Sequence, residues 1–140
     1  MSDLVIDASV ALKWVIAEDG TAEALALRHR HRLFAPDLLM AECANVLWRK
    51  SRLGELTRDE AAFAARLLQR ADIELTAMRP LLEPATRLAV ALDHPAYDCL
   101  YLALAESLSC DLVTADEGFA AKPLPAGVKA RVLPLTAGQG

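Results

Sequence analysis

Two aspartates stand just after short apolar runs that are typical of buried strands. Asp7 directly follows the run 4–6, and Asp116 comes two residues after the run 111–114. Either carboxylate could belong to a catalytic site, because sites in parallel sheets gather beyond the carboxyl ends of the strands. Either could also cap the helix that follows, because aspartate is a preferred N-cap residue. From the residues alone, both roles stay open.

Two further acids lie inside apolar helical patterns. Glu42 shares one helical stripe with Asn45 and Arg49, at spacings of three and seven residues. Asp98 falls in the first turn of a strongly apolar helix that Pro95 opens. A carboxylate in such a helix is costly to bury unless it is paired or binds a cation. The alternative for Glu42 is an ion pair with Arg49, and for Asp98 a favourable interaction with the helix dipole.

Together, the four carboxylates are the type of ligand that binds a hard divalent cation such as Mg²⁺ or Mn²⁺. Such a cation lowers the pKa of a bound water and neutralises a phosphate, which suits hydrolysis of phosphodiester bonds. The hydroxyls of Ser9 and Thr114 stand close in sequence to two of the acids and could line the same pocket. By contrast, His29, His31 and His94 lack the spacing of metal ligands, and we interpret them as surface or turn residues.

Strand-like and helix-like segments alternate along the whole chain. This alternation predicts an α/β fold in which a parallel sheet carries helices on both faces. The expected strands are 4–6, 33–35, 73–75, 111–114 and 128–133, and the expected helices are 8–17, 21–31, 37–52, 57–70, 81–92 and 96–109. We expect residues 136–140 to fray at the end of the chain.

The chain has 140 residues, of which 54% are hydrophobic and 24% charged, and its net charge is −4. These values predict one domain, residues 1–140, with a well-filled core, and they exclude a disordered chain. The apolar runs are far shorter than a membrane span, and no secretory signal pattern is visible at the start. Three cysteines without CxxC spacing favour a reducing compartment, so we expect a cytoplasmic protein with no membrane partner.

Four segments of the chain carry a family pattern, namely 5–14, 35–48, 97–105 and 112–119. In this order and spacing they resemble the PIN domain, and specifically the VapC-type ribonuclease toxins of prokaryotic toxin–antitoxin modules. The resemblance implies a PIN-like, three-layer α/β/α fold with a central parallel sheet of four to five strands flanked by helices. It also implies a metal site formed by Asp7, Glu42, Asp98 and Asp116, with Ser9 and Thr114 in support and Asn45 as an adjoining polar residue.

The activity implied by this resemblance is that of a metal-dependent RNA endonuclease acting as the toxin of a toxin–antitoxin module. The implied cofactor is Mg²⁺, with Mn²⁺ as the alternative. The implied partners are the RNA substrate, a small cognate antitoxin and a second copy of the chain in a homodimer. Two departures from the family pattern are Ala8 and Ala41, which stand where relatives often carry a small polar residue. Neither departure removes a carboxylate.

Two other classes of function compete with this interpretation. A PIN-like module could bind RNA or protein without cutting, but inactive members usually lack a site acid, and this chain has all four. An aspartyl-phosphate phosphotransferase would need a second acid two residues after Asp7, where this chain has Ser9. We therefore favour the nuclease.

The charges and apolar residues also predict how partners would bind. Of the 19 acidic residues, 15 remain when the four candidate site acids are set aside, and these balance the 15 basic ones. Contact with RNA is therefore expected to depend on the metal and on local arginines. We expect part of the helical surface around residues 10–70 to stay open for an amphipathic helix of the antitoxin. The candidate apolar residues there are Trp14, Phe63, Leu67 and Leu68.

Overall fold

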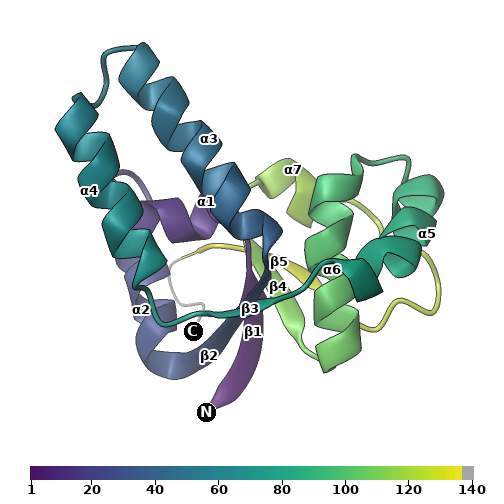
Figure 1. Cartoon of the computed structure of the whole chain (residues 1–140). Coiled ribbons are helices and arrows are strands. Elements are labelled where there is room, and N and C mark those ends of the chain that lie inside the picture. Colours follow the sequence, from purple (N-terminus) through teal and green to yellow (C-terminus); the bar gives the residue numbers. More distant parts are fainter. Residues whose placement is uncertain (137–140) are drawn as a thin grey trace.

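The computed structural model describes residues 1–136, which are built around one five-stranded, all-parallel sheet (Figure 1). The strands stand in the order β3-β2-β1-β4-β5, so the chain adds strands on one side of β1 and then crosses to the other. The strands are β1 Ser2–Ile6, β2 His31–Pro36, β3 Glu74–Thr76, β4 Asp111–Thr114 and β5 Val132–Pro134. The prediction of a parallel sheet with four to five strands is confirmed.

Helices cover both faces of the sheet, which gives three layers (Figure 1). α6 packs against β1, β2 and β4 with α5 outside it, whereas α1 to α4 lie on the other side. This division follows from the right-handedness of parallel crossovers, because the chain adds strands in opposite directions before and after β3. The α-helices are α1 Ala8–Ala11, α2 Thr21–Arg30, α3 Leu38–Arg52, α4 Arg58–Gln69, α5 Leu82–Leu92, α6 Ala96–Leu108 and α7 Glu117–Ala120; the 3₁₀ helices are η1 Leu12–Trp14 and η2 Arg79–Leu81.

The core lies between the central strands and α6. Val5, Ile6, Leu102 and Leu112 are all completely buried there. A strand that is covered on both faces needs apolar residues at successive positions, which explains the short continuous runs in the sequence. In the described part of the chain, no helix combines the length and the apolar character that crossing a membrane requires.

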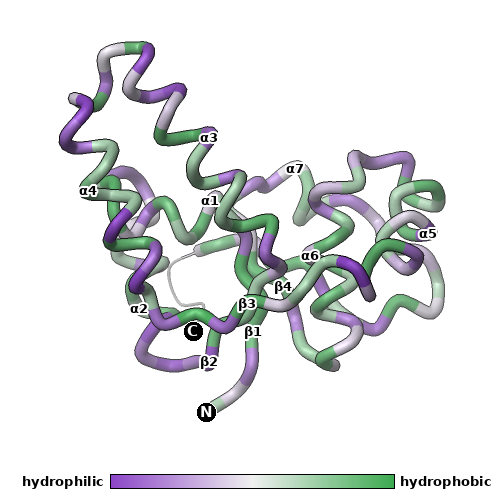
Figure 2. Tube along the Cα trace, viewed as in Figure 1, coloured by the Kyte–Doolittle hydropathy of each residue, from purple (hydrophilic) through white to green (hydrophobic). Residues whose placement is uncertain are grey.

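The α3 helix buries a single stripe, although its sequence is apolar in almost every direction. Leu39, Cys43 and Leu47 are buried at a spacing of four residues, while 56% of Trp48 is exposed. Figure 2 shows polar and apolar segments alternating along α3 where it projects with α4 away from the sheet. The prediction of an apolar helix is therefore correct only for one face, and the other face is available for contacts.

The helix expected over 8–17 is shorter than its apolar pattern indicated. The α-helical turn ends at Ala11 and continues as η1, and the backbone N–H of Val15 donates to the carbonyl of Leu12 at 3.1 Å. The indole N–H of Trp14 donates to the carbonyl of Ala24 in α2 at 2.9 Å. This contact with a later helix folds the segment onto α2.

The strand expected over 128–133 begins only at Val132. The backbone N–H groups of Lys129 and Ala130 donate to Oε1 of Glu106 in α6, at 2.6 and 3.2 Å. These donors are therefore used by a side chain and cannot pair with β4. Of the residues expected to fray, 137–140 lie outside the described part.

Candidate metal site

The order of strands reverses between β1 and β4, which are adjacent and parallel, with Ile6 paired to Val113. Asp7 directly follows β1, and Asp116 follows β4 by two residues, so both lie at the same edge of the sheet. We call this place, beyond the carboxyl ends of β1 and β4, the reversal point. In open α/β sheets, such a point is where a crevice for ligands forms.

Asp7 is buried, with 7% of its surface exposed. Its Oδ1 accepts hydrogen bonds from the hydroxyl of Ser9 at 2.5 Å and from the backbone N–H of Val10 at 3.3 Å, so the residue caps α1. Burial raises the pKa of Asp7 to about 6; hydrogen bonds, including one from Thr114, oppose the rise, and the charge of Asp98 adds to it. Among the ion pairs within residues 1–136, none includes Asp7.

Ser9 and Thr114 connect Asp7 with the loop that carries Asp116. Besides donating to Asp7, the Ser9 hydroxyl accepts from the backbone N–H of Ala115 at 2.9 Å and lies 3.5 Å from Oγ1 of Thr114. Oγ1 of Thr114 accepts from the backbone N–H of Asp116 at 3.1 Å. Asp116 itself caps α7, so the capping role open for both aspartates is confirmed. That role does not exclude the site role, because each carboxylate retains a second oxygen.

Glu42 lies half-buried on α3 and is fixed by a residue far away in sequence. The hydroxyl of Tyr101 in α6 donates to Oε1 of Glu42 at 2.6 Å. Burial raises the pKa of Glu42; the bond from Tyr101 opposes this rise, and the charge of Asp98 adds to it. Within residues 1–136, Glu42 forms no ion pair with Arg49. The exposed Asn45 lines a shallow pocket together with Glu42.

Asp98 lies in the first turn of α6, as predicted, and 31% of its side chain is exposed. Its Oδ2 lies 2.6 Å from Nε2 of His94, which stands in the turn between α5 and α6. His94 therefore stands in a turn, as predicted, but it is not a surface residue, because its side chain is 15% exposed and contacts a candidate ligand. The spacing of four residues to Asp98 is the sequence signal that could have indicated this contact.

Charge couples three of the acids, since Asp98 raises the pKa of both Asp7 and Glu42. The charge of Asp98 thus repels the other two acids, but burial is the larger cause of both raised pKa values. Within residues 1–136, no three His, Cys, Asp or Glu side chains form a ready-made metal cluster. The four candidate acids nevertheless suit a hard divalent cation, because such a cation prefers oxygen ligands and every carboxylate supplies them. In addition, Asp7 is buried and has no cationic partner in the described part of the chain.

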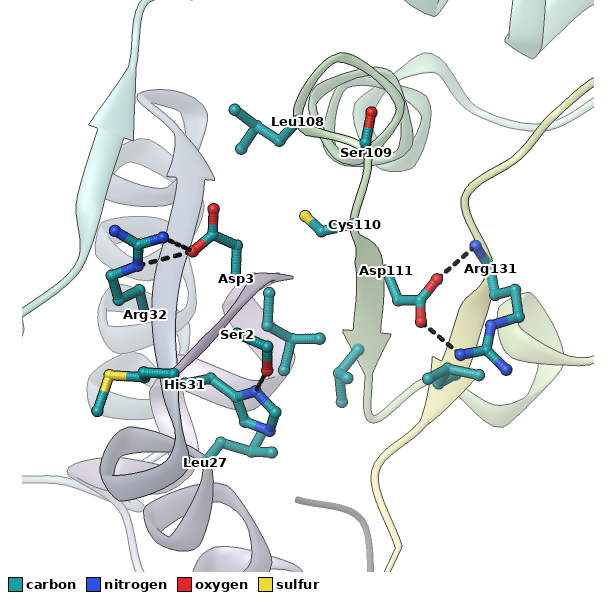
Figure 3. Close-up of a pocket in the computed structure, with 14 residues that line it drawn as sticks. Ser2, Asp3, Leu27, His31, Arg32, Leu108, Ser109, Cys110, Asp111 and Arg131 are labelled. Carbon is teal, nitrogen blue, oxygen red and sulfur yellow. Dashed lines mark hydrogen bonds and ion pairs between the residues drawn. The ribbon is translucent and has the colours of Figure 1, made fainter.

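A separate hollow lies at the opposite edge of the sheet, where the strands begin (Figure 3). Arg32 pairs there with Asp3, and Arg131 pairs with Asp111, each at 2.7 Å. The first pair joins β2 to β1, and the second joins the residue before β5 to β4. Within each pair the two opposite charges neutralise each other. The hollow lies away from the carboxyl ends of the strands, so we assign the candidate site to the reversal point.

Comparisons with known proteins agree with this fold. A family model for the PIN domain matches residues 4–123. Ribonuclease VapC3 of Pyrobaculum aerophilum is 32% identical over 122 residues, which cover 85% of this chain and 93% of that protein. The crystal structure of PAE2754 from Pyrobaculum aerophilum superposes with a TM-score of 0.69 at 25% identity, covering 93% of this chain and 83% of its own.

The same fold occurs in the crystal structure of VapBC2 from Rickettsia felis bound to a DNA fragment from their promoter, with a TM-score of 0.66 at 11% identity. That match covers 95% of this chain and 98% of the other. The five-stranded parallel sheet and the family match define the class: the chain belongs to the PIN-domain family. Within this family it groups with the VapC-type ribonucleases.

Proposed function

We propose that the chain is an endoribonuclease that acts as the toxin of a toxin–antitoxin module and hydrolyses RNA phosphodiester bonds with Mg²⁺, or alternatively Mn²⁺. The observation that carries this proposal is Asp7, a carboxylate buried at the reversal point with no cationic partner in the described part of the chain. A cation there would offset the cost of burying its charge. The similarity to ribonuclease VapC3 supports RNA as the substrate.

The proposed ligands are Asp7, Glu42, Asp98 and Asp116. A divalent cation bound to them would lower the pKa of a water and neutralise charge on the phosphate. The chain's own groups orient the ligands: the hydroxyl of Ser9 holds Oδ1 of Asp7, and the hydroxyl of Tyr101 holds Oε1 of Glu42. Thr114 fixes the start of the loop that carries Asp116.

The direct test replaces a ligand by its isosteric amide. We expect Asp98→Asn to reduce cleavage of a mixed RNA pool in Mg²⁺ by at least about 100-fold, because the amide weakens a metal ligand while the fold is retained. The matched control is Asp19→Asn, an exposed acid whose carboxylate makes no bond in the described part. Full cleavage by the Asp98→Asn protein in the presence of EDTA would contradict the mechanism.

The same experiment separates the nuclease from a module that only binds. If the wild-type protein retains RNA on a filter but leaves it intact in both Mg²⁺ and Mn²⁺, the binding module is the better description. Tagging the chain in its native host and identifying the co-purified RNA and protein would then name its partners.

We also propose a small antitoxin as partner, and the α3–α4 hairpin as the surface that receives it. Trp48, Leu53, Phe63 and Leu67 are exposed on and just after these two helices, at 56%, 63%, 54% and 43%. Two of the residues expected from the sequence do not belong to this exposed apolar surface. Leu68 is 4% exposed, and Trp14 packs against the core and donates a hydrogen bond to α2. The VapBC2 structure, which contains both proteins of such a pair, supports this proposal.

Two further properties are proposed from the family resemblance. The chain would form a homodimer, which size-exclusion chromatography with light scattering can measure. It would act in the cytoplasm, where RNA is accessible and thiols stay reduced. In support of this, its three cysteines are free, and Cys43 and Cys99 are buried.

A further inference from the structure

His94 stands between Asp98, a candidate metal ligand, and the ammonium group of Lys122. Its Nε2 lies 2.6 Å from Oδ2 of Asp98, and its Nδ1 lies 3.2 Å from Nζ of Lys122. An ammonium group can only donate hydrogen bonds. Nδ1 is therefore the acceptor, the ring proton is on Nε2, and Nε2–H donates to Asp98. In this way Lys122 selects the tautomer of His94 that can hold the carboxylate.

The ring of His94 is also held by α7, the short helix that Asp116 caps. His94 stacks on Phe119, with ring centroids 4.7 Å apart and planes at 17°. The backbone N–H of Phe119 donates to Oδ1 of Asp116 at 3.1 Å. The ring of Phe119 thus packs on His94, which contacts Asp98, and the backbone N–H of Phe119 binds Asp116. Asp98 and Asp116, which come from separate elements, are connected through His94 and Phe119.

Lys122 completes the connection on the other side. Besides its contact with His94, its Nζ donates to the carbonyl of Asp93 at 3.2 Å. Asp93 ends α5 in the left-handed conformation, with φ of 50°, and directly precedes His94. Lys122 therefore joins the chain after α7 to the turn before α6, 28 residues away in sequence. The contacts of Lys122 and Phe119 leave His94 little freedom to rotate.

We propose that His94 is a positioning residue for the metal site: supported by Phe119 and Lys122, it holds Oδ2 of Asp98 so that the other oxygen is directed to the cation. This inference rests on the proposed function, because it assigns Asp98 to a metal. Groups that hydrogen-bond to a metal ligand orient it and commonly change metal affinity by about 10- to 100-fold when they are removed. Neither the acidic pattern nor the family resemblance indicated a role for His94.

Two substitutions separate the hydrogen bond from the packing of the ring. His94→Phe keeps the stacking on Phe119 and removes the donor to Asp98. His94→Gln keeps an N–H donor close to the position of Nε2 and removes the stacked ring. Affinity is measured by calorimetric titration of Mn²⁺ alone into the metal-free protein, and thermal unfolding in EDTA is recorded for each variant. Asp19→Asn serves again as the control for a remote change.

We expect His94→Phe to weaken Mn²⁺ binding by about 10-fold or more. His94→Gln is expected to stay within about threefold of the wild type, because the donor to Asp98 is restored. The unfolding temperatures in EDTA should not follow this order, since the proposed role concerns the ligand and not the fold. If His94→Phe does not fold, Lys122→Met takes its place and should weaken binding by less than about 10-fold, because the donor to Asp98 remains but its tautomer is no longer selected.

Several results would overturn the inference. If His94→Phe binds Mn²⁺ as well as the wild type does, or more tightly, His94 does not position the ligand. If both variants lose affinity equally and in step with their unfolding temperatures, the role of His94 is structural only; unchanged affinity in Lys122→Met counts against the inference in the same way. A wild-type protein that binds no Mn²⁺ overturns it as well. In that case RNA cleavage decides whether the nuclease proposal also fails.

Discussion

At the scale of single residues, Asp7 makes folding and metal binding depend on pH. Burial raises its pKa from 3.8 to about 6, so between these values the folded protein binds more protons than the unfolded chain. The stability of the metal-free protein therefore falls as pH rises through this window and stays lower above it. A shift of about two pKa units corresponds to about 3 kcal/mol. Asp7→Asn should recover part of this energy, about 1–3 kcal/mol, at pH 8 and none at pH 4.

Urea unfolding in EDTA at the two pH values measures this difference. Comparing each variant with the wild type at the same pH cancels the titration of the remaining acids, and Asp19→Asn again provides the control. Equal stabilities of the Asp7→Asn and wild-type proteins at pH 8 would show that the buried carboxylate is not the costly group described here. Because Asp7→Asn is expected to lose RNA cleavage as it gains stability, the two effects together identify a functional acid.

At the scale of elements, Glu106 holds the loop that leads into β5. Its Oε1 accepts from two backbone N–H groups of the loop that precedes β5, and β5 pairs with β4, which ends at Thr114. We expect Glu106→Ala to lower the free energy of unfolding by about 2 kcal/mol, because a charged acceptor for both donors is lost. Glu106→Gln keeps an acceptor and should lose less than half of that amount in the same denaturant titration. Equal losses in the two variants would assign the effect to packing of the side chain instead.

At the scale of the whole molecule, the α3–α4 hairpin projects away from the sheet (Figure 1), and it exposes the apolar side chains of Trp48, Leu53, Phe63 and Leu67. A partner helix on these side chains would be held mainly by apolar contacts, and an Arg or Lys reaching the carboxylates would add a contact that salt weakens. We therefore expect the antitoxin complex to survive purification at high salt and to cut RNA more slowly than the free chain in excess Mg²⁺. Phe63→Asp should weaken the complex, while Glu83→Gln on α5 should not. A stable complex that cuts at the rate of the free protein would rule out the blocking role.

The sequence by itself determined the layers of the fold and the positions of the candidate acids along the chain. Apolar runs and helical spacing are local properties, and they placed Asp7 and Asp116 after β1 and β4. The family resemblance then singled out the same acids. Right-handed crossovers leave few ways to arrange such a chain, so the parallel sheet could be predicted with its helices on both faces.

Only the tertiary structure decided which distant residues hold those acids. Tyr101 reaches Glu42 across 59 positions, and Lys122 reaches His94 across 28, and no local pattern records such contacts. The same reason explains the elements that were predicted wrongly. Trp14 bonds to α2 where the first helix was expected to continue, and Glu106 binds the backbone donors that a longer β5 would have used. Propensity sets the local preference of a segment, whereas buried hydrogen-bond donors find their partners only once the whole chain has folded.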